Sequence, residues 1–186
     1  MNQYTRTKEK LVYANSFIEL FDDEVIRPDG TPGTYVRLRY RGNPPGVVIL
    51  PRFADGRYVL LAVNRYAAGE ESLEFPRGSA STDESAEQGA RRELEEETRL
   101  VASSSRLLGY LRPDTAIVET EVRVFLMEIP EEQIASIELD EAGEAISSYQ
   151  LLALGEIWAK IRAGTIRDGF TIGALGLLAA QGAAEL

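Results

Sequence analysis

Residues 78–100 read GSASTDESAEQGARRELEEETRL and carry the strongest signal in the chain. Thr82 or Asp83 can serve as an N-cap, and helix-favouring residues continue to Thr98, so a helix is predicted within residues 81–98. Its second half, RELEEETRL, holds four glutamates. Glutamates three and four positions apart repel each other on a helix. The stretch is therefore either a solvated acidic face or a place where something positive sits among the carboxylates.

Helical geometry places three of these carboxylates together. At about 100° per residue, Glu93, Glu96 and Glu97 share one face, while Glu95 points nearly opposite, towards solvent. Arg92 lies four residues before Glu96, where it can orient the cluster. The neighbouring side of the helix, expected to pack on a sheet, carries small and apolar residues: Ala86, Ala90, Leu94 and Val101. The carboxylates therefore sit beside the buried edge of the helix.

Clustered carboxylates at a partly buried edge are costly unless they are protonated or neutralised, and a divalent cation neutralises them directly. The chain contains no histidine and no cysteine. A metal site must then be built from oxygen ligands, which suit magnesium, manganese or calcium better than zinc. A general base must be a carboxylate, a lysine, a tyrosine or water. For the octapeptide RRELEEET alone, a solvated face with intrahelical ion pairs remains the alternative.

The wider spacing resembles a known motif. Gly78 is followed by five residues, Glu84, seven residues and then RELEEETRL. This resembles the Nudix box, in which glycine, five residues, glutamate and seven residues precede arginine, glutamate, an aliphatic residue, any residue, two glutamates, any residue, glycine and an aliphatic residue. Arg99 stands where the box has glycine. A left-handed helix end there costs a non-glycine residue about 1 kcal/mol but removes no metal ligand, so activity is expected to be retained.

The resemblance implies roles for the box residues, with magnesium or manganese as the cofactor. It makes Glu93 and Glu97 the main metal ligands and Glu96 a direct or water-mediated ligand. Arg92 would hold the glutamates in place. The backbone carbonyl of Arg77, just before the box glycine, is a further candidate ligand. Glu84 is expected to stabilise the loop and helix geometry, with a simple acid at the helix N-terminus as the alternative.

Other residues are assigned outside the box. In the similar pyrophosphatases the catalytic glutamate can come from a loop after the box, which makes Glu119 the first candidate base and Glu121 the second; both can equally be solvent-facing residues at a strand start. Arg65 and Arg77 are candidate phosphate ligands, and Tyr66 is a candidate to stack on a base or ribose. For each of these three residues, a surface arginine or a core tyrosine is the alternative.

The flanking sequence also resembles one branch of the family. The stretches DDEVIRPDGTPGTYVRLRY, GVVILPRFADGRYVLLAVNRY and DGFTIGALGLLAA are similar to ADP-ribose and nucleotide-sugar pyrophosphatases. The implied activity is metal-dependent hydrolysis of the pyrophosphate bond in a nucleoside diphosphate linked to another moiety, with ADP-ribose or an ADP-sugar as lead substrate. The alternatives are dinucleoside polyphosphates, modified nucleoside triphosphates, and a catalytically inactive Nudix-fold module that binds or regulates.

The implied fold is the Nudix α/β/α sandwich, with a mixed β-sheet and extra N-terminal strands. One domain is expected over residues 1–186, with N-terminal strands over about residues 1–45 that form a homodimer by analogy with related pyrophosphatases. The residue pattern agrees with this fold. It predicts a hairpin at VVILPRFADGRYVLLAV, strands at RLLGYLRP, EVRVFLMEIP and ISSYQLLAL, and helices at GEIWAKIRAG and DGFTIGALGLLAAQ.

Charge and hydropathy bound the partners and the location. The chain has 20 basic and 30 acidic residues, a net charge of −10, so it gains no general attraction to nucleic acid or anionic membranes. A small-molecule nucleotide is the expected partner. The N-terminus, MNQYTRTKEK, lacks the apolar core of a signal peptide, and FTIGALGLLAA is too short to span a bilayer. A cytoplasmic protein is the simplest expectation.

Overall fold

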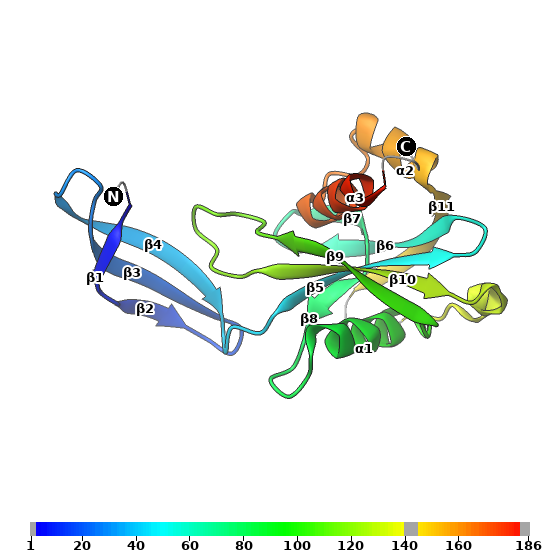
Figure 1. Cartoon of the computed structure of the whole chain (residues 1–186), viewed down its shortest axis with the longest axis horizontal. Coiled ribbons are helices and arrows are strands. Elements are labelled where there is room, and N and C mark those ends of the chain that lie inside the picture. The colour runs from blue at the N-terminus through cyan, green and yellow to red at the C-terminus, as the bar shows by residue number, and fades with distance from the viewer. Residues whose placement is uncertain (1–2, 140–144, 183–186) are drawn as a thin grey trace. The chain divides into compact units, whose positions relative to one another are not determined.

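The computed structural model describes residues 3–139 and 145–182. The chain divides into two units (Figure 1). The first unit comprises Met1–Pro44 and Arg112–Glu121, and the second comprises Pro45–Leu111 and Val122–Leu186. The helix that carries Glu93, Glu96 and Glu97 belongs to the second unit, whereas Glu119 and Glu121 belong to the first.

The first unit is built on an antiparallel sheet. Within the described residues it has four strands, β1 (Thr5–Lys8), β2 (Leu11–Ala14), β3 (Ile18–Ile26) and β4 (Pro32–Tyr40). β4 pairs with β3 along its whole length, while β1 pairs with one end of β3 and β2 with the other. β1 and β2 therefore lie end to end along the second edge of β3. The expectation of extra strands at the N-terminus is confirmed.

The loop at residues 112–121 is fixed to β4. Leu38 exchanges backbone hydrogen bonds with it, donating to the Ile117 carbonyl (2.7 Å) and accepting from the Glu119 N–H (2.9 Å). The Tyr35 hydroxyl donates to the Ala116 carbonyl at 2.7 Å. These bonds attach residues 112–121 to the first unit, although in the sequence they lie between β9 (Ser104–Leu111) and β10 (Val122–Ile129) of the second unit.

The second unit contains a mixed sheet, as the sequence predicts. In the described part of the chain it has seven strands, with the order β11-β6-β5-β10-β9, β7 beside β6 and β8 beside β5. β5 and β10 are parallel, and the other pairs are antiparallel. The strands are β5 (Gly46–Phe53), β6 (Arg57–Arg65), β7 (Glu70–Glu74), β8 (Arg77–Ser79), β9 (Ser104–Leu111), β10 (Val122–Ile129) and β11 (Ile146–Ala153).

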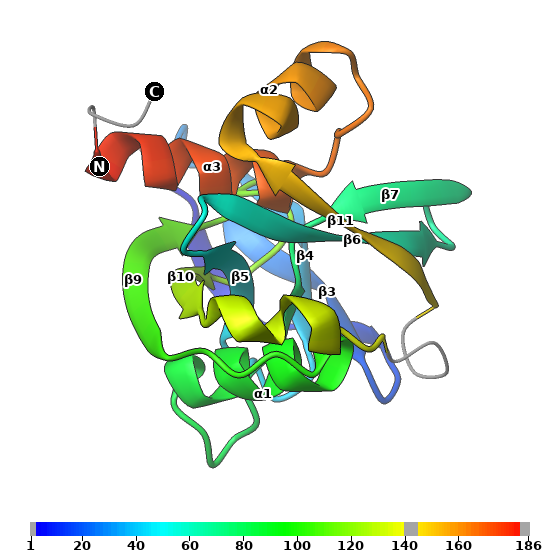
Figure 2. The same ribbon diagram turned by 90° about the vertical axis from the view of Figure 1, so that its right-hand side faces the viewer.

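Helices cover both faces of this sheet (Figure 2). They are α1 (Ala86–Thr98), α2 (Leu154–Arg162) and α3 (Gly169–Gln181), with a short 3-10 helix, η1 (Glu131–Ser136). Successive residues of β5 alternate between the two cores: Val47 and Ile49 pack with α1, and Val48 and Leu50 pack with α2 and α3. This alternation follows from the two-residue period of a strand. The predicted α/β/α sandwich is confirmed.

The start of α1 lies later than predicted. Its N-cap is Ser85, whose side chain accepts from the Gln88 N–H while the Gln88 side chain accepts from the Ser85 N–H. Thr82 and Asp83, the predicted N-caps, lie in a turn. The prediction was wrong because the reciprocal capping box at Ser85 satisfies two helix-end donors at once. Acidic residues are common in the first turn of a helix, and those near Asp83 therefore indicated too early a start.

The end of α1 matches the expectation at the position where the box has glycine. Arg99 adopts a left-handed conformation, φ 60° and ψ 11°, and its N–H donates to the Glu95 carbonyl at 2.8 Å. The chain reverses there, so Leu100 is fully buried and Val101 is 55% exposed. The expectation that Val101 packs on the sheet was wrong because it extended helical geometry past the left-handed residue.

Arg99→Gly is expected to stabilise the protein by about 1 kcal/mol, because glycine adopts the left-handed conformation without a Cβ clash. The melting temperature should rise by about 2–4 °C in a chain of this size. Thermal unfolding measures this directly. Arg99→Ala is the matched control, since it removes the same side chain but keeps a Cβ. Equal melting temperatures for the two variants would contradict the prediction.

Among the residues that the structure describes, no helix is both long enough and apolar enough to cross a bilayer.

Candidate active site

The centre of the site is the contact between β8 and α1. Glu93 is 9% exposed, and its Oε1 accepts a hydrogen bond from the Ser79 N–H at 3.1 Å. A Cβ on Gly78 would lie 2.1 Å from Cδ of Glu93. Glycine at this position therefore leaves the space that the carboxylate fills. Burial, partly opposed by the Ser79 and Arg92 hydrogen bonds, raises the pKa of Glu93.

Arg92 makes hydrogen bonds to several residues of the box. Its Nη1 donates to Glu93 Oε1 (3.1 Å) and to Glu96 Oε2 (2.8 Å). Its Nη2 donates to the Ser79 carbonyl at 2.8 Å, and its Nε donates to Glu84 Oε1 at 3.0 Å. One guanidinium thus joins α1, β8 and the intervening turn. The hydrogen bond to Glu84, working against burial, raises the pKa of Arg92.

Glu84 has the structural role that was expected. Its carboxylate accepts from Arg92 and from the Ser81 N–H, the latter at 2.9 Å. The Arg92 hydrogen bond, followed by that of Ser81, lowers the pKa of Glu84. Both bonds fix the turn that leads into α1.

The other glutamates of α1 differ in exposure. Glu97 is 4% exposed and lies one turn after Glu93, whereas the Glu96 side chain is 54% exposed and Glu95 faces solvent. Among the described residues, no three carboxylate, histidine or cysteine side chains form a group that could hold a metal ion. Glu93 and Glu97 are thus the buried carboxylates of α1, whereas Glu96 is exposed and bound by Arg92.

These donors fit a magnesium-type cation. Such ions bind proteins through one or two carboxylates and complete their shell with water and substrate phosphates. Glu93 and Glu97, at positions i and i+4, supply two carboxylates on one face of α1. The glycine at position 78 keeps that face clear of side chains beside Glu93. Oxygen donors alone match the preference of magnesium and manganese.

A second cluster joins Arg65 and Arg77, both predicted as phosphate ligands, to Glu74, which the sequence did not predict as a site residue. This carboxylate is 2% exposed at the end of β7. Its Oε2 accepts from Arg65 Nη2 at 2.7 Å and from Arg77 Nε at 2.9 Å. Burial opposes ionisation, but the hydrogen bond from Arg65 and the charge of Arg77 together lower the pKa of Glu74. The segment LEFPRG contains the signal, a lone acidic residue three positions before Arg77.

The side chains of Arg77 and Tyr66 lie in different environments. The Arg77 guanidinium lies over the Phe170 ring, 4.4 Å from its centroid, and its Nη2 is 3.9 Å from Oδ1 of Asp168, the N-cap of α3. The Arg77 side chain therefore points to the face of β8 that α3 covers. Gly78, the next residue along the strand, presents its Cα to α1. Tyr66 is fully exposed in the turn between β6 and β7, so it is not a core tyrosine.

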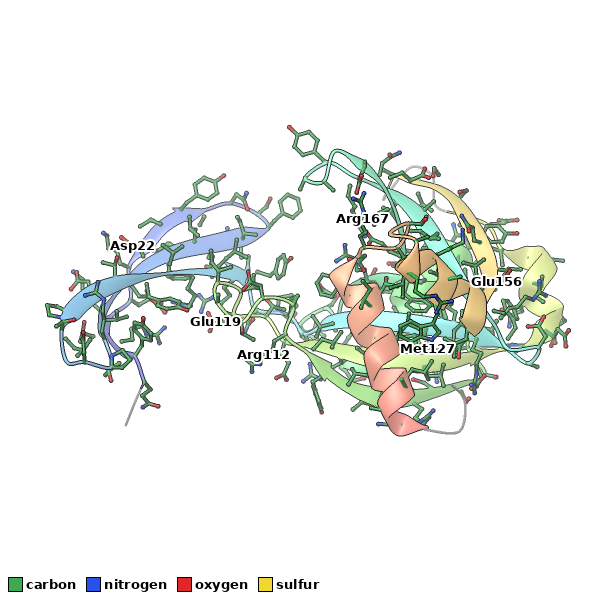
Figure 3. All side chains as sticks on the ribbon, turned by 90° about the horizontal axis from the view of Figure 1, so that it is seen from above. Asp22, Arg112, Glu119, Met127, Glu156 and Arg167 are labelled. Carbon is green, nitrogen blue, oxygen red and sulfur yellow. The ribbon has the colours of Figure 1, made fainter. Side chains whose placement is uncertain are left out.

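Glu119 and Glu121 lie on the loop of the first unit, where Figure 3 labels Glu119 and Arg112. The Glu119 carboxylate accepts a short hydrogen bond from Arg37, whose guanidinium also binds Asp23 at 2.8 Å. Glu121 accepts from Arg112 at 3.1 Å. Both candidate bases are ion-paired within this unit, with side chains that are 37% and 40% exposed.

Gly89 is a further position that the sequence reading did not single out. A Cβ there would lie 2.6 Å from the Ala80 Cα. This close approach packs α1 against Ala80, the residue that follows β8, and so positions Glu93 and Arg92 relative to the strand. A glycine inside a helical pattern was the available signal, because glycine in a helix interior is costly without a packing reason.

Comparison with known proteins agrees with this geometry. The sequence matches the family model of the NUDIX domain over residues 42–171. No curated protein matches it. Among solved structures, the crystal structure of an ADP compounds hydrolase is similar, with a TM-score of 0.80 and 17% sequence identity over 99% of this chain and 97% of that chain. The NUDIX match spans well over half of the sequence and includes β8 and α1, so the chain belongs to the Nudix family.

Proposed function

We propose that this Nudix hydrolase cleaves the pyrophosphate bond of a nucleoside diphosphate linked to another moiety, with ADP-ribose or an ADP-sugar as lead substrate and magnesium or manganese as cofactor. The observation that carries the proposal is the burial of two carboxylates of α1, Glu93 and Glu97, of which Glu93 fills the space left by Gly78. The similar fold of an ADP compounds hydrolase and the resemblance of the flanking sequence support the ADP compounds as lead substrates.

Each residue of the site has a defined part in this proposal. Glu93 and Glu97 would hold the cation, with Glu96 and the Arg77 carbonyl as additional or water-mediated ligands. A bound divalent cation would supply positive charge against the negative charge of the diphosphate. Arg92 keeps Glu93 and Glu96 in their orientation through its hydrogen bonds to both.

The remaining roles concern the substrate and the attacking water. Arg65 and Arg77 would bind phosphate oxygens, and Tyr66 would stack on the base or ribose. Glu119, with Glu121 as second candidate, would accept a proton from the water. Arg37 binds one oxygen of the Glu119 carboxylate, Oε2. If kcat is unchanged in both Glu119→Gln and Glu121→Gln, neither residue is the base.

The test is product formation from ADP-ribose, ADP-glucose, diadenosine polyphosphates and nucleoside triphosphates, with and without magnesium or manganese. We expect metal-dependent release of AMP from ADP-ribose or ADP-glucose. Turnover of only the polyphosphates or triphosphates would overturn the substrate while keeping the reaction. If nothing is turned over but ligands bind in a metal-dependent manner, the protein is an inactive binding module and the proposed activity is refuted.

We also propose a homodimer formed through the first unit. Large apolar side chains in this unit are exposed, Phe17 the most at 74%. The others are Tyr4, Leu11, Val12, Tyr13, Val36, Tyr40 and Ile117. Exposed apolar side chains in such number favour a protein partner over solvent. A second copy of this chain is the partner expected from related pyrophosphatases.

Light scattering should therefore report a particle of twice the chain mass of 20.5 kDa. The double variant Leu11→Glu/Tyr13→Glu places two charges on the exposed strand β2 and should yield monomers. Glu95→Gln, on the solvent face of α1, is the control and should remain dimeric. A wild-type particle of 20.5 kDa would refute the dimer.

A further inference from the structure

The chain changes its neighbouring strand between β7 and β8. β7 pairs with β6 as far as Glu74, whereas β8 pairs with β5 from Arg77 onwards. Phe75 and Pro76, both buried, form the crossing between the two. A buried backbone N–H outside a sheet ladder needs another acceptor. The position of β8 therefore depends on what holds this crossing.

The acceptor is a side chain of α3, which lies on the face of the sheet opposite α1 (Figure 2). The Phe75 N–H donates to Thr171 Oγ1 at 3.0 Å. The Thr171 hydroxyl in turn donates to Oδ2 of Asp168, the N-cap of α3, at 2.8 Å. Thr171 is fully buried, so both bonds lie away from solvent. One hydroxyl thus joins the start of α3 to the crossing.

The preceding residue of α3 contacts the other end of the crossing. The Phe170 ring lies against the Arg77 guanidinium, whose carbon is 4.4 Å from the ring centroid. A cation over an aromatic ring is attracted by the negative charge of the ring face. Arg77 Nε also donates to Glu74 at 2.9 Å, so this side chain is fixed from two directions. Consecutive residues of α3 thus hold the crossing at both ends, through a backbone N–H and through a side chain.

The strand that follows the crossing contacts Glu93 directly. β8 has three residues, which pair with three residues of β5. Gly78 leaves the space that Glu93 fills, and the Ser79 N–H donates to the same carboxylate at 3.1 Å. This space is narrow, since a Cβ on Gly78 would lie 2.1 Å from Glu93 Cδ. A small shift of β8 would therefore displace Glu93 or break its hydrogen bond.

We propose that Phe170 and Thr171 are positioning residues for the cation site on the opposite face of the sheet. They act through β8, which they hold where Gly78 and Ser79 receive the carboxylate of Glu93. This inference rests on the proposed function, in which Glu93 and the Arg77 carbonyl bind the cation. The contact between α3 and the crossing thus determines metal affinity, although α3 supplies none of the proposed ligands.

Thr171→Val is the direct test. Valine removes the hydroxyl and leaves the Phe75 N–H without its acceptor. The affinity for manganese, measured by electron paramagnetic resonance without substrate, should fall about tenfold, as when hydrogen bonds behind a metal ligand are removed. Thr171→Ser keeps the hydroxyl and should bind manganese as wild type does.

Leu178→Ala is the matched control for a loss of stability. Leu178 is buried on the same helix, about 10 Å further along its axis, and its truncation leaves a cavity in the core that α3 shares with the sheet. The melting temperature should fall at least as far as in Thr171→Val, while the manganese affinity stays at the wild-type value. If manganese affinity follows the melting temperature in both variants, the effect is one of stability and the inference is overturned.

Phe170→Leu is the second variant, which decides if Thr171→Val does not fold. Leucine keeps an apolar side chain but removes the ring from the Arg77 guanidinium. The manganese affinity should fall about threefold, the effect of losing a partly exposed cation–π contact. Unchanged manganese affinity in the folded variants overturns the inference.

The outcomes are distinct from those of the proposed activity. If wild type binds manganese but hydrolyses none of the substrates, the activity is refuted, and the affinities of the variants still decide the inference. Hydrolysis by wild type with unchanged affinity in Thr171→Val would refute the positioning role alone. Failure of wild type to bind manganese would overturn both the cation site and the inference.

Discussion

Glu97→Gln is expected to lower metal-dependent hydrolysis by about 1000-fold or more, because a cation held by carboxylates contributes several kcal/mol to the transition state and each 1.36 kcal/mol is a factor of ten. Glu97 is 4% exposed on α1, one turn from Glu93. Glutamine keeps the shape of the side chain and removes its charge. The affinity for manganese, measured by electron paramagnetic resonance, should fall together with kcat.

The control for this prediction is on the same helix. Glu95→Gln makes the same chemical change on the solvent face of α1 and should leave both activity and manganese affinity unchanged. Thermal unfolding of Glu97→Gln should match or exceed that of wild type, since a buried carboxylate costs more than a buried amide. Full activity in Glu97→Gln would refute its role as a metal ligand.

Gly78→Ala is expected to reduce hydrolysis by about 100-fold, the effect of displacing a catalytic group by about 1 Å. The added Cβ would lie 2.1 Å from Glu93 Cδ and 2.4 Å from both carboxylate oxygens. Glu93 cannot move away without losing its hydrogen bonds from the Ser79 N–H and Arg92. Gly78 has no left-handed backbone conformation, so the clash alone, and no backbone strain, accounts for the effect.

Measuring stability distinguishes displacement of Glu93 from a general loss of structure. Overpacking at one methyl group costs about 1–3 kcal/mol, so Gly78→Ala should fold with a lowered melting temperature. Gly176→Ala, in α3, places a Cβ where no heavy atom lies within 4 Å and should keep full activity. If Gly78→Ala retained wild-type kcat and metal affinity, the close contact with Glu93 would have no functional meaning.

Helix α1 shows how much of the structure local sequence can predict. The spacing of Gly78, Glu84 and the glutamates of RELEEETRL correctly predicted a helix here, α1, because residues at these intervals share one surface of a helix. The left-handed residue at Arg99 was also expected from the motif. The start of α1 was misplaced, since Thr82, Asp83 and Ser85 are all acceptable N-caps and only the reciprocal bonds with Gln88 select one.

The roles of residues that meet through the fold were beyond local patterns. Arg65, Glu74 and Arg77 come from three strands, and a period of two residues says which face each side chain takes but not which partner it finds. The ion pair between Arg37 and Glu119 joins residues far apart in the chain through the pairing of β4 with the loop. Neither set of contacts can be predicted from the spacing of these residues in the sequence.

The sequence by itself determined the family, the sandwich and the residues of the box, because a motif of fixed spacing specifies one helix and the strand before it. Only the tertiary structure decided which carboxylates are buried, that a guanidinium takes Glu96, and that a single buried glutamate joins two arginines. Burial and pairing depend on what the rest of the chain packs against each side chain, and this is a property of contacts between elements rather than of the order of residues within one.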